Sequence, residues 1–156
     1  MALSTNFRVR LAIPSDVSTL APLFWSLWPE SPVAHHAGEL QQMLAGTFQS
    51  VMPLLVFVAE ENGAILGFLE AGLRSTADDC DVSRPVGYVE GWYVIESRRG
   101  QGIGRALLSA AEDWARQQGC REMASDADIN NTLSHRVHQA SGFTIAARSI
   151  LFRKTL

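Results

Sequence analysis

Cysteine is scarce in this chain of 156 residues, which contains only Cys80 and Cys120. The two show neither a CxxC pair nor a Cys/His ligand spacing, the patterns that indicate a disulfide framework or a zinc site. The sequence therefore predicts no metal site. Unpaired thiols of this kind are typical of a cytoplasmic protein.

Positive charge is not in excess, since 13 basic and 16 acidic residues give a formal net charge of -3 at pH 7. A protein that binds nucleic acid through its phosphates carries clustered lysine and arginine. The composition therefore argues against a nucleic-acid partner.

Signals for export and membrane insertion are also lacking. The N-terminal stretch does not show the basic-then-apolar order of a signal peptide, because Arg8 and Arg10 interrupt it. A charge-free stretch over residues 40–59 contains three glutamines and Pro53. We expect a helix end, a turn and a buried strand there rather than a membrane helix, and hence a cytoplasmic protein without a membrane partner.

Apolar residues are abundant: 47% of the chain is hydrophobic and 19% is charged. This balance is typical of a globular domain rather than of a disordered chain. A chain of this size buries about 68–70% of the surface that it exposes when unfolded. We expect residues 1–156 to form one domain.

Hydrophobic periodicity predicts strands and helices along the whole chain. Strands are expected over residues 7–13, 54–60, 64–74, 86–95, 121–125 and 143–153. Helices are expected over residues 17–27, after a turn at 14–16, and over about 36–48, 102–117 and 131–140. Residues 61–63 (ENG) predict a type I′ hairpin turn, because Asn and Gly tolerate positive φ. The order predicts a mixed α/β fold with helices on the faces of one sheet.

A glycine-rich turn over residues 99–104 (RGQGIG) joins a predicted strand to a predicted helix. Free backbone amides and the helix dipole attract anions at such a helix N-terminus, and larger side chains would block the approach. The turn lacks the Gly-Lys-Ser/Thr ending of a Walker A loop, and its strand is not N-terminal as in a dinucleotide-binding fold. We expect it to bind phosphate groups.

This turn resembles the pyrophosphate-binding signature of the GNAT superfamily of N-acetyltransferases, Arg/Gln-x-x-Gly-x-Gly/Ala. A second family pattern is matched further along, at Asn131, Ser134, His138, Gly142 and Phe143. The resemblance implies the GNAT fold, a central and mostly antiparallel sheet with splayed fourth and fifth strands, flanked by helices on both faces. It implies acetyl-CoA as the co-substrate. The residues implied to bind it are Trp92, Tyr93, Val94, Arg99, Gly100, Gln101, Gly102, Ile103, Gly104, Arg105 and Asn131.

Four stretches are similar to one group of aminoglycoside 6′-N-acetyltransferases: residues 27–29 (LWP), 90–94 (EGWYV), 124–126 (ASD) and 137–143 (VHQASGF). The resemblance implies transfer of an acetyl group to the 6′-amine of aminoglycosides by direct attack in a ternary complex, and with it antibiotic resistance. It also implies a homodimer, since the other subunit often contributes a wall of the acceptor site in this group.

The chain departs from this group at two positions. Ala77 stands where members carry an aromatic residue, and Ala147 stands where they carry an acid. Both differences are expected to alter the range of acceptors.

Acidic residues at the predicted strands favour a cationic acceptor. Strand periodicity predicts that Tyr88, Glu90 and Trp92 share one face. Glu90 and Asp126 can then hold ammonium groups through charge-assisted hydrogen bonds, with Glu70 on the preceding strand placed similarly.

Each of these acceptor-site residues has a structural alternative. Trp28 lies where a predicted helix ends, so it either covers a sugar ring or fills the core. Glu90 alternatively pairs with a local arginine, and Asp126 alternatively caps a turn or a helix.

Three residues are predicted to act in the transfer itself. The amine must lose a proton, and Glu90 is the predicted general base, acting through water. The Val94 N–H is predicted to stabilise the oxyanion. His138 stands where many family members carry a tyrosine, and it either protonates the leaving thiolate or only bridges helix and sheet. Cys120 has no base nearby in sequence, so a covalent route through it is not expected.

Two other functions remain open from the sequence. The chain is alternatively an acetyltransferase for another small polyamine or a protein amine, or a non-catalytic acyl-CoA-binding sensor. Turnover with any amine excludes the sensor, and the acceptor profile separates the enzymes.

Overall fold

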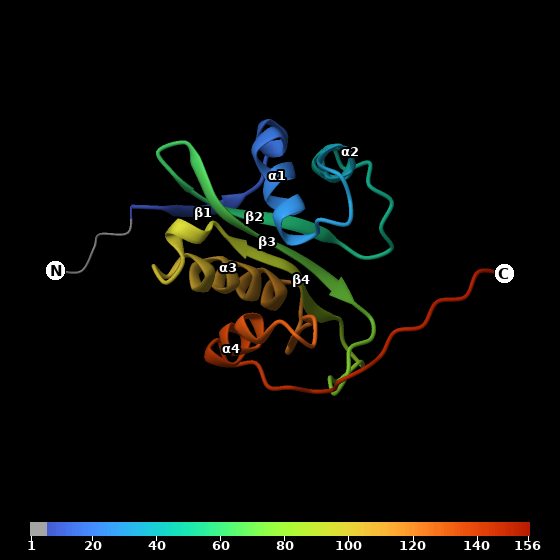
Figure 1. The fold of residues 1–156 in the computed structure, drawn as a ribbon. Coiled ribbons are helices and arrows are strands. Elements are labelled where there is room, and N and C mark those ends of the chain that lie inside the picture. Colours follow the sequence, from blue (N-terminus) through green and yellow to red (C-terminus); the bar gives the residue numbers. More distant parts are fainter. Residues whose placement is uncertain (1–5) are drawn as a thin grey trace.

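A five-stranded sheet forms the centre of the molecule (Figure 1). The computed structural model describes residues 6–156; residues 1–5, part of the stretch in which no signal peptide is expected, lie outside the described residues. The strands are adjacent in chain order: β1 (Arg8–Leu11), β2 (Leu54–Glu61), β3 (Ala64–Arg74), β4 (Val86–Val94) and β5 (Met123–Ser125). β1 to β4 are antiparallel and β5 is parallel to β4, which confirms the predicted mixed sheet.

Helices cover both faces of this sheet, as the sequence predicts (Figure 1). They are α1 (Val17–Leu27) and α2 (Val33–Leu44) on one face, and α3 (Ile103–Gln117), followed later by α4 (Thr132–Ala140), on the other. Phe68 and Leu69 of β3 face opposite sides because they are neighbours on a strand. Phe68 stacks on Phe24 of α1 with ring centroids 4.2 Å apart, while Leu69 shares a buried cluster with Leu107 of α3. Within residues 6–156, no helix combines the length and apolar character needed to cross a membrane.

Two turns explain where the neighbouring elements end. α2 ends at Leu44, earlier than the predicted helix over 36–48, because Gly46 takes a φ of 71° and left-handed residues end helices. The hairpin between β2 and β3 has φ values of 51° at Asn62 and 83° at Gly63. Positive φ at both positions confirms the predicted type I′ turn.

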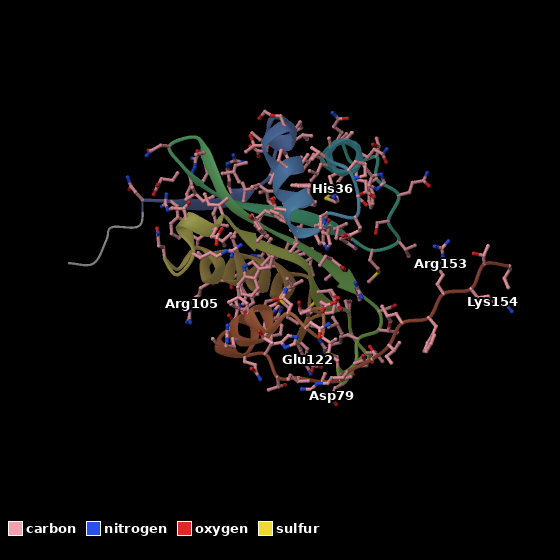
Figure 2. All side chains as sticks on the ribbon, viewed as in Figure 1. His36, Asp79, Arg105, Glu122, Arg153 and Lys154 are labelled. Carbon is pink, nitrogen blue, oxygen red and sulfur yellow. The ribbon has the colours of Figure 1, made fainter. Side chains whose placement is uncertain are left out.

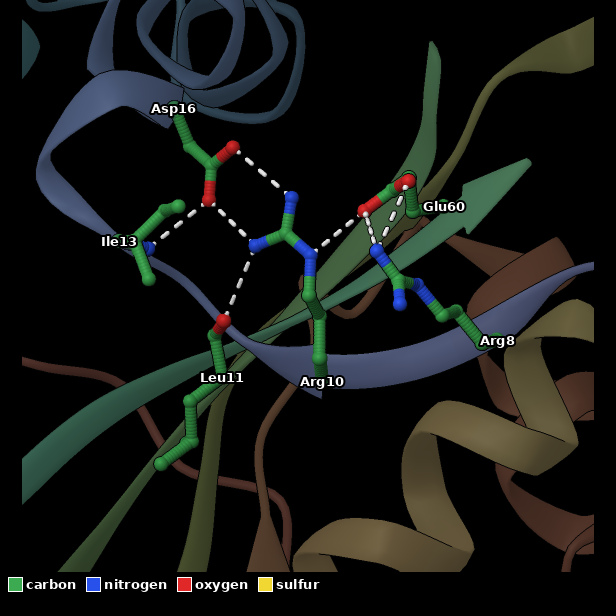
Figure 3. Close-up of polar contacts among 6 residues, drawn as sticks. All are labelled: Arg8, Arg10, Leu11, Ile13, Asp16 and Glu60. Atoms are coloured by element: carbon green, nitrogen blue, oxygen red, sulfur yellow. Dashed lines mark hydrogen bonds and ion pairs between the residues drawn. The ribbon is translucent and has the colours of Figure 1, made fainter. Parts of the chain in front are cut away.

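A network of ion pairs holds β1 against its neighbours (Figure 3). The Arg10 guanidinium donates to Asp16 at 2.6 Å and to Glu60 of β2 at 2.7 Å, and Arg8 also reaches Glu60 at 3.2 Å. The hydrogen bond from Arg10 lowers the pKa of Asp16 below its usual value. β1 is therefore joined to both β2 and the start of α1, although it has only four residues.

The predicted closing strand over residues 143–153 is wrong for the single chain. Residues 143–156 form no strand, and the segment runs away from the sheet, with Arg153 and Lys154 far from the body (Figures 1 and 2). Its alternating apolar residues are exposed, with Ile150 at 80% and Phe152 at 91%. A strand needs backbone pairing with a neighbour, and the alternation that suggested one does not say which chain supplies that neighbour.

Candidate active site

The site is centred on the edge of β4 that faces β5. The two strands pair only between residues 87–89 and residues 123–125, so residues 90–94 have no strand partner on that edge within the described chain. Ile95 donates its N–H to the Leu66 carbonyl of β3 at 2.9 Å. Successive amides point to opposite sides of a strand, so the Val94 N–H points toward the open edge. This is the predicted splay between the fourth and fifth strands.

A β-bulge in β4 changes which residues share a face. Glu70 of β3 pairs with Gly91 and Ala71 pairs with Val89, which leaves Glu90 as the extra residue. A bulge shifts the alternation of side chains by one. The prediction that Tyr88, Glu90 and Trp92 share one face is therefore wrong for Trp92.

The neighbours of these side chains confirm the shift. An added Cβ at Gly104 of α3 would lie 3.3 Å from the Trp92 ring, so Trp92 lies on the α3 face. A Glu90 oxygen lies 3.4 Å from an added Cβ at Gly72, which is two residues after Glu70 on the α1 and α2 face. The carboxylates of Glu70 and Glu90 are thereby on the same face.

Glu90 and Asp126 belong to one polar network. Arg74 donates to the two Glu90 oxygens at 3.0 and 2.6 Å, and its guanidinium carbon lies 3.4 Å from the centre of the Tyr88 ring. The Tyr88 hydroxyl donates to Asp126 at 2.8 Å. The hydrogen bond with Glu90 raises the pKa of Arg74, and burial followed by the bond to Asp126 raises the pKa of Tyr88. In the structure, Glu90 thus pairs with a local arginine, which is the structural alternative to its predicted role.

Glu70 lines a cavity of about 320 Å³ between α1, α2 and β3. Only 9% of the residue is exposed, and its carboxyl makes no hydrogen bond within residues 6–156. Burial, and to a smaller extent Glu90 and Glu39, raise the pKa of Glu70 to about 8. Glu70 is therefore largely uncharged at neutral pH until a cation reaches it.

Trp28 packs into the core, which is its structural alternative, and also forms one wall of the same cavity; that it covers a sugar ring stays a prediction. Its ring centroid lies 6.2 Å from that of Phe68 and 5.3 Å from that of Phe24. A Cβ at Gly91 would collide with the Trp28 ring, so glycine is needed where the indole meets β4. The His36 ring, between α1 and α2 (Figure 2), bonds the Trp28 carbonyl through Nε2 at 3.0 Å and holds the end of α1.

The glycine-rich turn has the conformation that anion binding requires. Gly100 and Gly102 have φ values of 73° and 84°, and Gly102 immediately precedes α3. Arg99 donates from Nε to the Val94 carbonyl at 2.9 Å, which ties the turn to the open edge of β4. The backbone amides of residues 100–105 have no acceptor within the described part of the chain. They form a cradle for a negatively charged group.

The other predicted residues of this turn are placed differently from one another. Gln101 accepts from Arg98 at 2.9 Å, and Arg98 also pairs with Glu61 at 2.7 Å, so the Gln101 side chain stabilises the turn. Ile103 is buried under the sheet, and the Arg105 side chain extends into solvent (Figure 2).

His138 bridges α4 and β5 beside the point where β4 and β5 separate. Its Nδ1 lies 2.8 Å from the Ser134 carbonyl, which can only accept, so Nδ1 carries a proton. Its Nε2 lies 2.9 Å from the Ser125 hydroxyl, and its ring meets Trp92 edge-on at 5.6 Å. Asn131 accepts from the Ser134 N–H at 3.0 Å and caps α4. The geometry therefore brings His138 and Trp92 together and leaves Asn131 at the helix end.

Sequence reasoning missed Arg74, Ser125 and His36. Arg74 lies in a run that was interpreted only as a strand, and its position two residues from Gly72 on the acidic face was the signal that could have identified it. Ser125 lies between Ala124 and Asp126 in a stretch singled out for Asp126 alone.

The sequence and the fold match those of known acetyltransferases. The model of the Acetyltransferase (GNAT) family matches residues 20–143, and the chain belongs to this family. Aminoglycoside N(6')-acetyltransferase type 1 of Klebsiella aerogenes is 40% identical over 148 residues, covering 95% of this chain and 96% of that protein. The enzyme of the same name from Stenotrophomonas maltophilia is 38% identical over 148 residues, covering 95% and 93%.

Solved structures agree with these relatives. The aminoglycoside N-acetyltransferase AAC(6')-Iy in complex with CoA is 33% identical, with a TM-score of 0.87 over 100% of this chain and 99% of that one. The same enzyme with a bisubstrate analogue, CoA-S-monomethyl-acetylneamine, has a TM-score of 0.85 over 97% and 100%. The predictions of a GNAT fold and of similarity to aminoglycoside 6′-N-acetyltransferases are confirmed.

Proposed function

We propose that the chain is an aminoglycoside 6′-N-acetyltransferase that uses acetyl-CoA and confers resistance to these antibiotics. The observation that carries the proposal is the acidic face of Glu70, Glu90 and Asp126 beside β4, whose open edge leads into a turn suited to phosphate. The relatives named for this activity cover nearly the whole chain. Residues 1–156 then serve as one catalytic domain.

Acetyl-CoA fits the open edge and the turn after it. The free amides of residues 100–105 suit the pyrophosphate, with Arg99 holding the turn against Val94. The pantetheine arm then follows the backbone of residues 92–94 toward Asn131 and α4. Arg105 is exposed on the first turn of α3 and is available to a phosphate.

The acceptor binds on the face that carries the carboxylates. An ammonium group competes with Arg74 for Glu90, and Asp126 attracts the acceptor's positive charge from the other side of Tyr88. Trp28 offers an apolar wall to a sugar ring. The acidic face also steers a polycation toward the site.

The transfer then proceeds by direct attack. Glu90 takes a proton from the bound ammonium through water, and the free amine forms a C–N bond with the thioester carbonyl carbon. The Val94 N–H donates to the oxyanion that develops. When the C–S bond breaks, the thiolate receives a proton from the doubly protonated form of His138 through Nε2, while Nδ1 keeps its proton on the Ser134 carbonyl, and the new amide nitrogen releases its second proton to solvent.

The experiment that tests this function measures thiol release from acetyl-CoA with tobramycin, spermidine and a peptide in parallel. Mass spectrometry of the tobramycin product then gives the acetylated position. Acetylation at the 6′-amine, with the other two acceptors inert, supports the proposal. Turnover with only spermidine or only the peptide would leave the fold and the turn but reject the aminoglycoside function.

The exposed C-terminal segment supports a homodimer and is its proposed interface. Large apolar residues are exposed throughout the last part of the chain: Ile129, Leu133, Val137, Ile145, Ile150, Leu151, Phe152 and Leu156. Apolar residues gathered in this way mark surfaces that a partner covers. Sedimentation of the full chain is expected to give a dimer, and Ile150→Asp with Phe152→Asp a monomer. A monomeric full chain would contradict the homodimer.

The unpaired Cys80 and Cys120 fit a cytoplasmic location.

A further inference from the structure

The mechanism leaves one buried acidic group unused. Glu70 lies at the floor of the cavity between α1, α2 and β3, 9% exposed and without a hydrogen-bond partner among the described residues. A carboxylate in such a place is costly unless a cation pairs with it. We propose, on the basis of the function above, that Glu70 binds a second ammonium group of the acceptor, and that this cavity selects acceptors with two or more such groups.

The charged groups around the cavity are acids or histidines with other partners, so the Glu70 carboxyl remains available to a ligand. Glu39 and Glu30 also line it, and Glu90 lies nearby on β4. His35 lies 3.4 Å from Glu39, and His36 is bonded to the Trp28 carbonyl.

Arg74, the arginine on the same strand as Glu70, is already occupied. Both nitrogens that Arg74 directs at β4 are used by Glu90, at 3.0 and 2.6 Å. No cationic side chain of residues 6–156 therefore pairs with Glu70, and a cation that pairs with it must arrive with the ligand.

The position of the cavity allows one molecule to reach both carboxylates. Glu70 pairs in register with Gly91, the residue that follows Glu90 on β4, and the carboxylates of Glu70 and Glu90 lie on the same face of the sheet. The walls formed by Phe24, Trp28 and Phe48 are apolar, which suits the carbon skeleton that separates two amines in an aminoglycoside or a polyamine. An acceptor with a single amine can satisfy Glu90 or Glu70, but not both.

The cavity also couples binding to a proton. Glu70 holds its proton in the free protein, because its pKa is about 8, and an ammonium group displaces that proton. Glu30, Glu39 and Glu90 favour the displacement by attracting the cation, and His35 opposes it when protonated.

The test is calorimetric titration of tobramycin, and of spermidine in parallel, into the wild-type protein, Glu70→Gln and the control Asp113→Asn. Asp113 is an exposed acid on α3, on the opposite face of the sheet, so its change removes one charge without reaching the cavity. We expect Glu70→Gln to weaken binding at least tenfold at pH 8.5, while Asp113→Asn changes it less than twofold.

The pH dependence distinguishes a cation subsite from a structural role. We compare the Kd of Glu70→Gln with that of the wild type as a ratio. This ratio is expected to rise roughly fiftyfold between pH 6 and pH 8, because wild-type Glu70 must lose its proton to bind the cation at pH 6 and has lost much of it at pH 8. Glu70→Ala, checked for folding by circular dichroism, is expected to follow Glu70→Gln.

Three results would overturn the inference. The first is that wild type and Glu70→Gln have equal Kd values at pH 6 and at pH 8. The second is that Asp113→Asn weakens binding as much as Glu70→Gln does. The third is that neither polycation binds to the wild type. Binding that depends on Glu70, combined with no acetylation of tobramycin, would retain the subsite and reject the proposed function. The two proposals can therefore fail separately.

Discussion

Replacing Glu70 by glutamine is expected to change how the stability of the fold depends on pH. Burial raises the pKa of the Glu70 carboxyl from its ordinary value of 4.5 to about 8 in the folded chain. Between these values the folded state holds a proton that the unfolded state has lost, so stability falls as the pH rises. Below pH 4.5 the contribution is fully present, and above pH 8 it is lost.

The size of the effect follows from the same shift. At about 1.4 kcal/mol per pKa unit, wild type should lose roughly 3 kcal/mol by pH 7 and roughly 5 kcal/mol above pH 8, relative to pH 4. Glu70→Gln removes the titrating group while keeping the shape of the side chain, so this loss disappears. The variant should therefore become more stable than wild type at high pH, although it binds polycations less well.

Urea denaturation at pH 5, 7 and 9 measures this difference. The gap in unfolding free energy between variant and wild type should widen steadily across the three pH values, with m-values unchanged. Parallel pH profiles for the two proteins would refute the reasoning, because they would mean that the Glu70 carboxyl is ionised and solvated in the folded chain.

Three further substitutions test the remaining parts of the site. Gly102→Val should raise KM for acetyl-CoA tenfold or more with a smaller change in acceptor KM, since a branched side chain at a φ of 84° strains the anion-binding turn; steady-state kinetics with each substrate varied measures this. Glu90→Gln should lower kcat at least a hundredfold while the Kd for acetyl-CoA stays within twofold, and equal losses in both would reject Glu90 as the base. Arg74→Met should lower the acceptor KM several-fold at low ionic strength, because Glu90 loses its competing cation; an unchanged KM would show that Arg74 does not obstruct binding.

The elements with a strong local pattern could be predicted from the sequence. The amphipathic helix expected over 102–117 is α3, Ile103–Gln117, and the hairpin turn at residues 61–63 has both positive φ values. In each case a periodic pattern and a glycine at its end specify the conformation without help from distant residues.

For the site, the sequence predicts which side chains alternate along one strand, but not how neighbouring strands align. Period-two alternation places Glu90 and Trp92 on one face, but the bulge depends on how β3 and β4 align, with Glu70 opposite Gly91. The pairing of Arg74 with Glu90 likewise depends on two strands and an intervening loop. The missing closing strand has a similar cause, because apolar alternation over residues 143–153 specifies a buried strand but not the chain that buries it.

The bulge at Glu90 links the fold to the chemistry. Without it, β4 would direct Glu90 and Trp92 to one face, and either the carboxylate or the indole would be on the wrong side of the sheet. With it, the α1 and α2 face collects Glu70 and Glu90 for a cationic acceptor, while Trp92 packs against α3 and His138 on the other side. The open edge of β4 runs between these faces and leads into the turn at residues 99–104, where free amides favour anions. In the proposed function, a polyanionic co-substrate and a polycationic acceptor would thereby bind at separate places, and their reacting groups would meet at the edge near Val94.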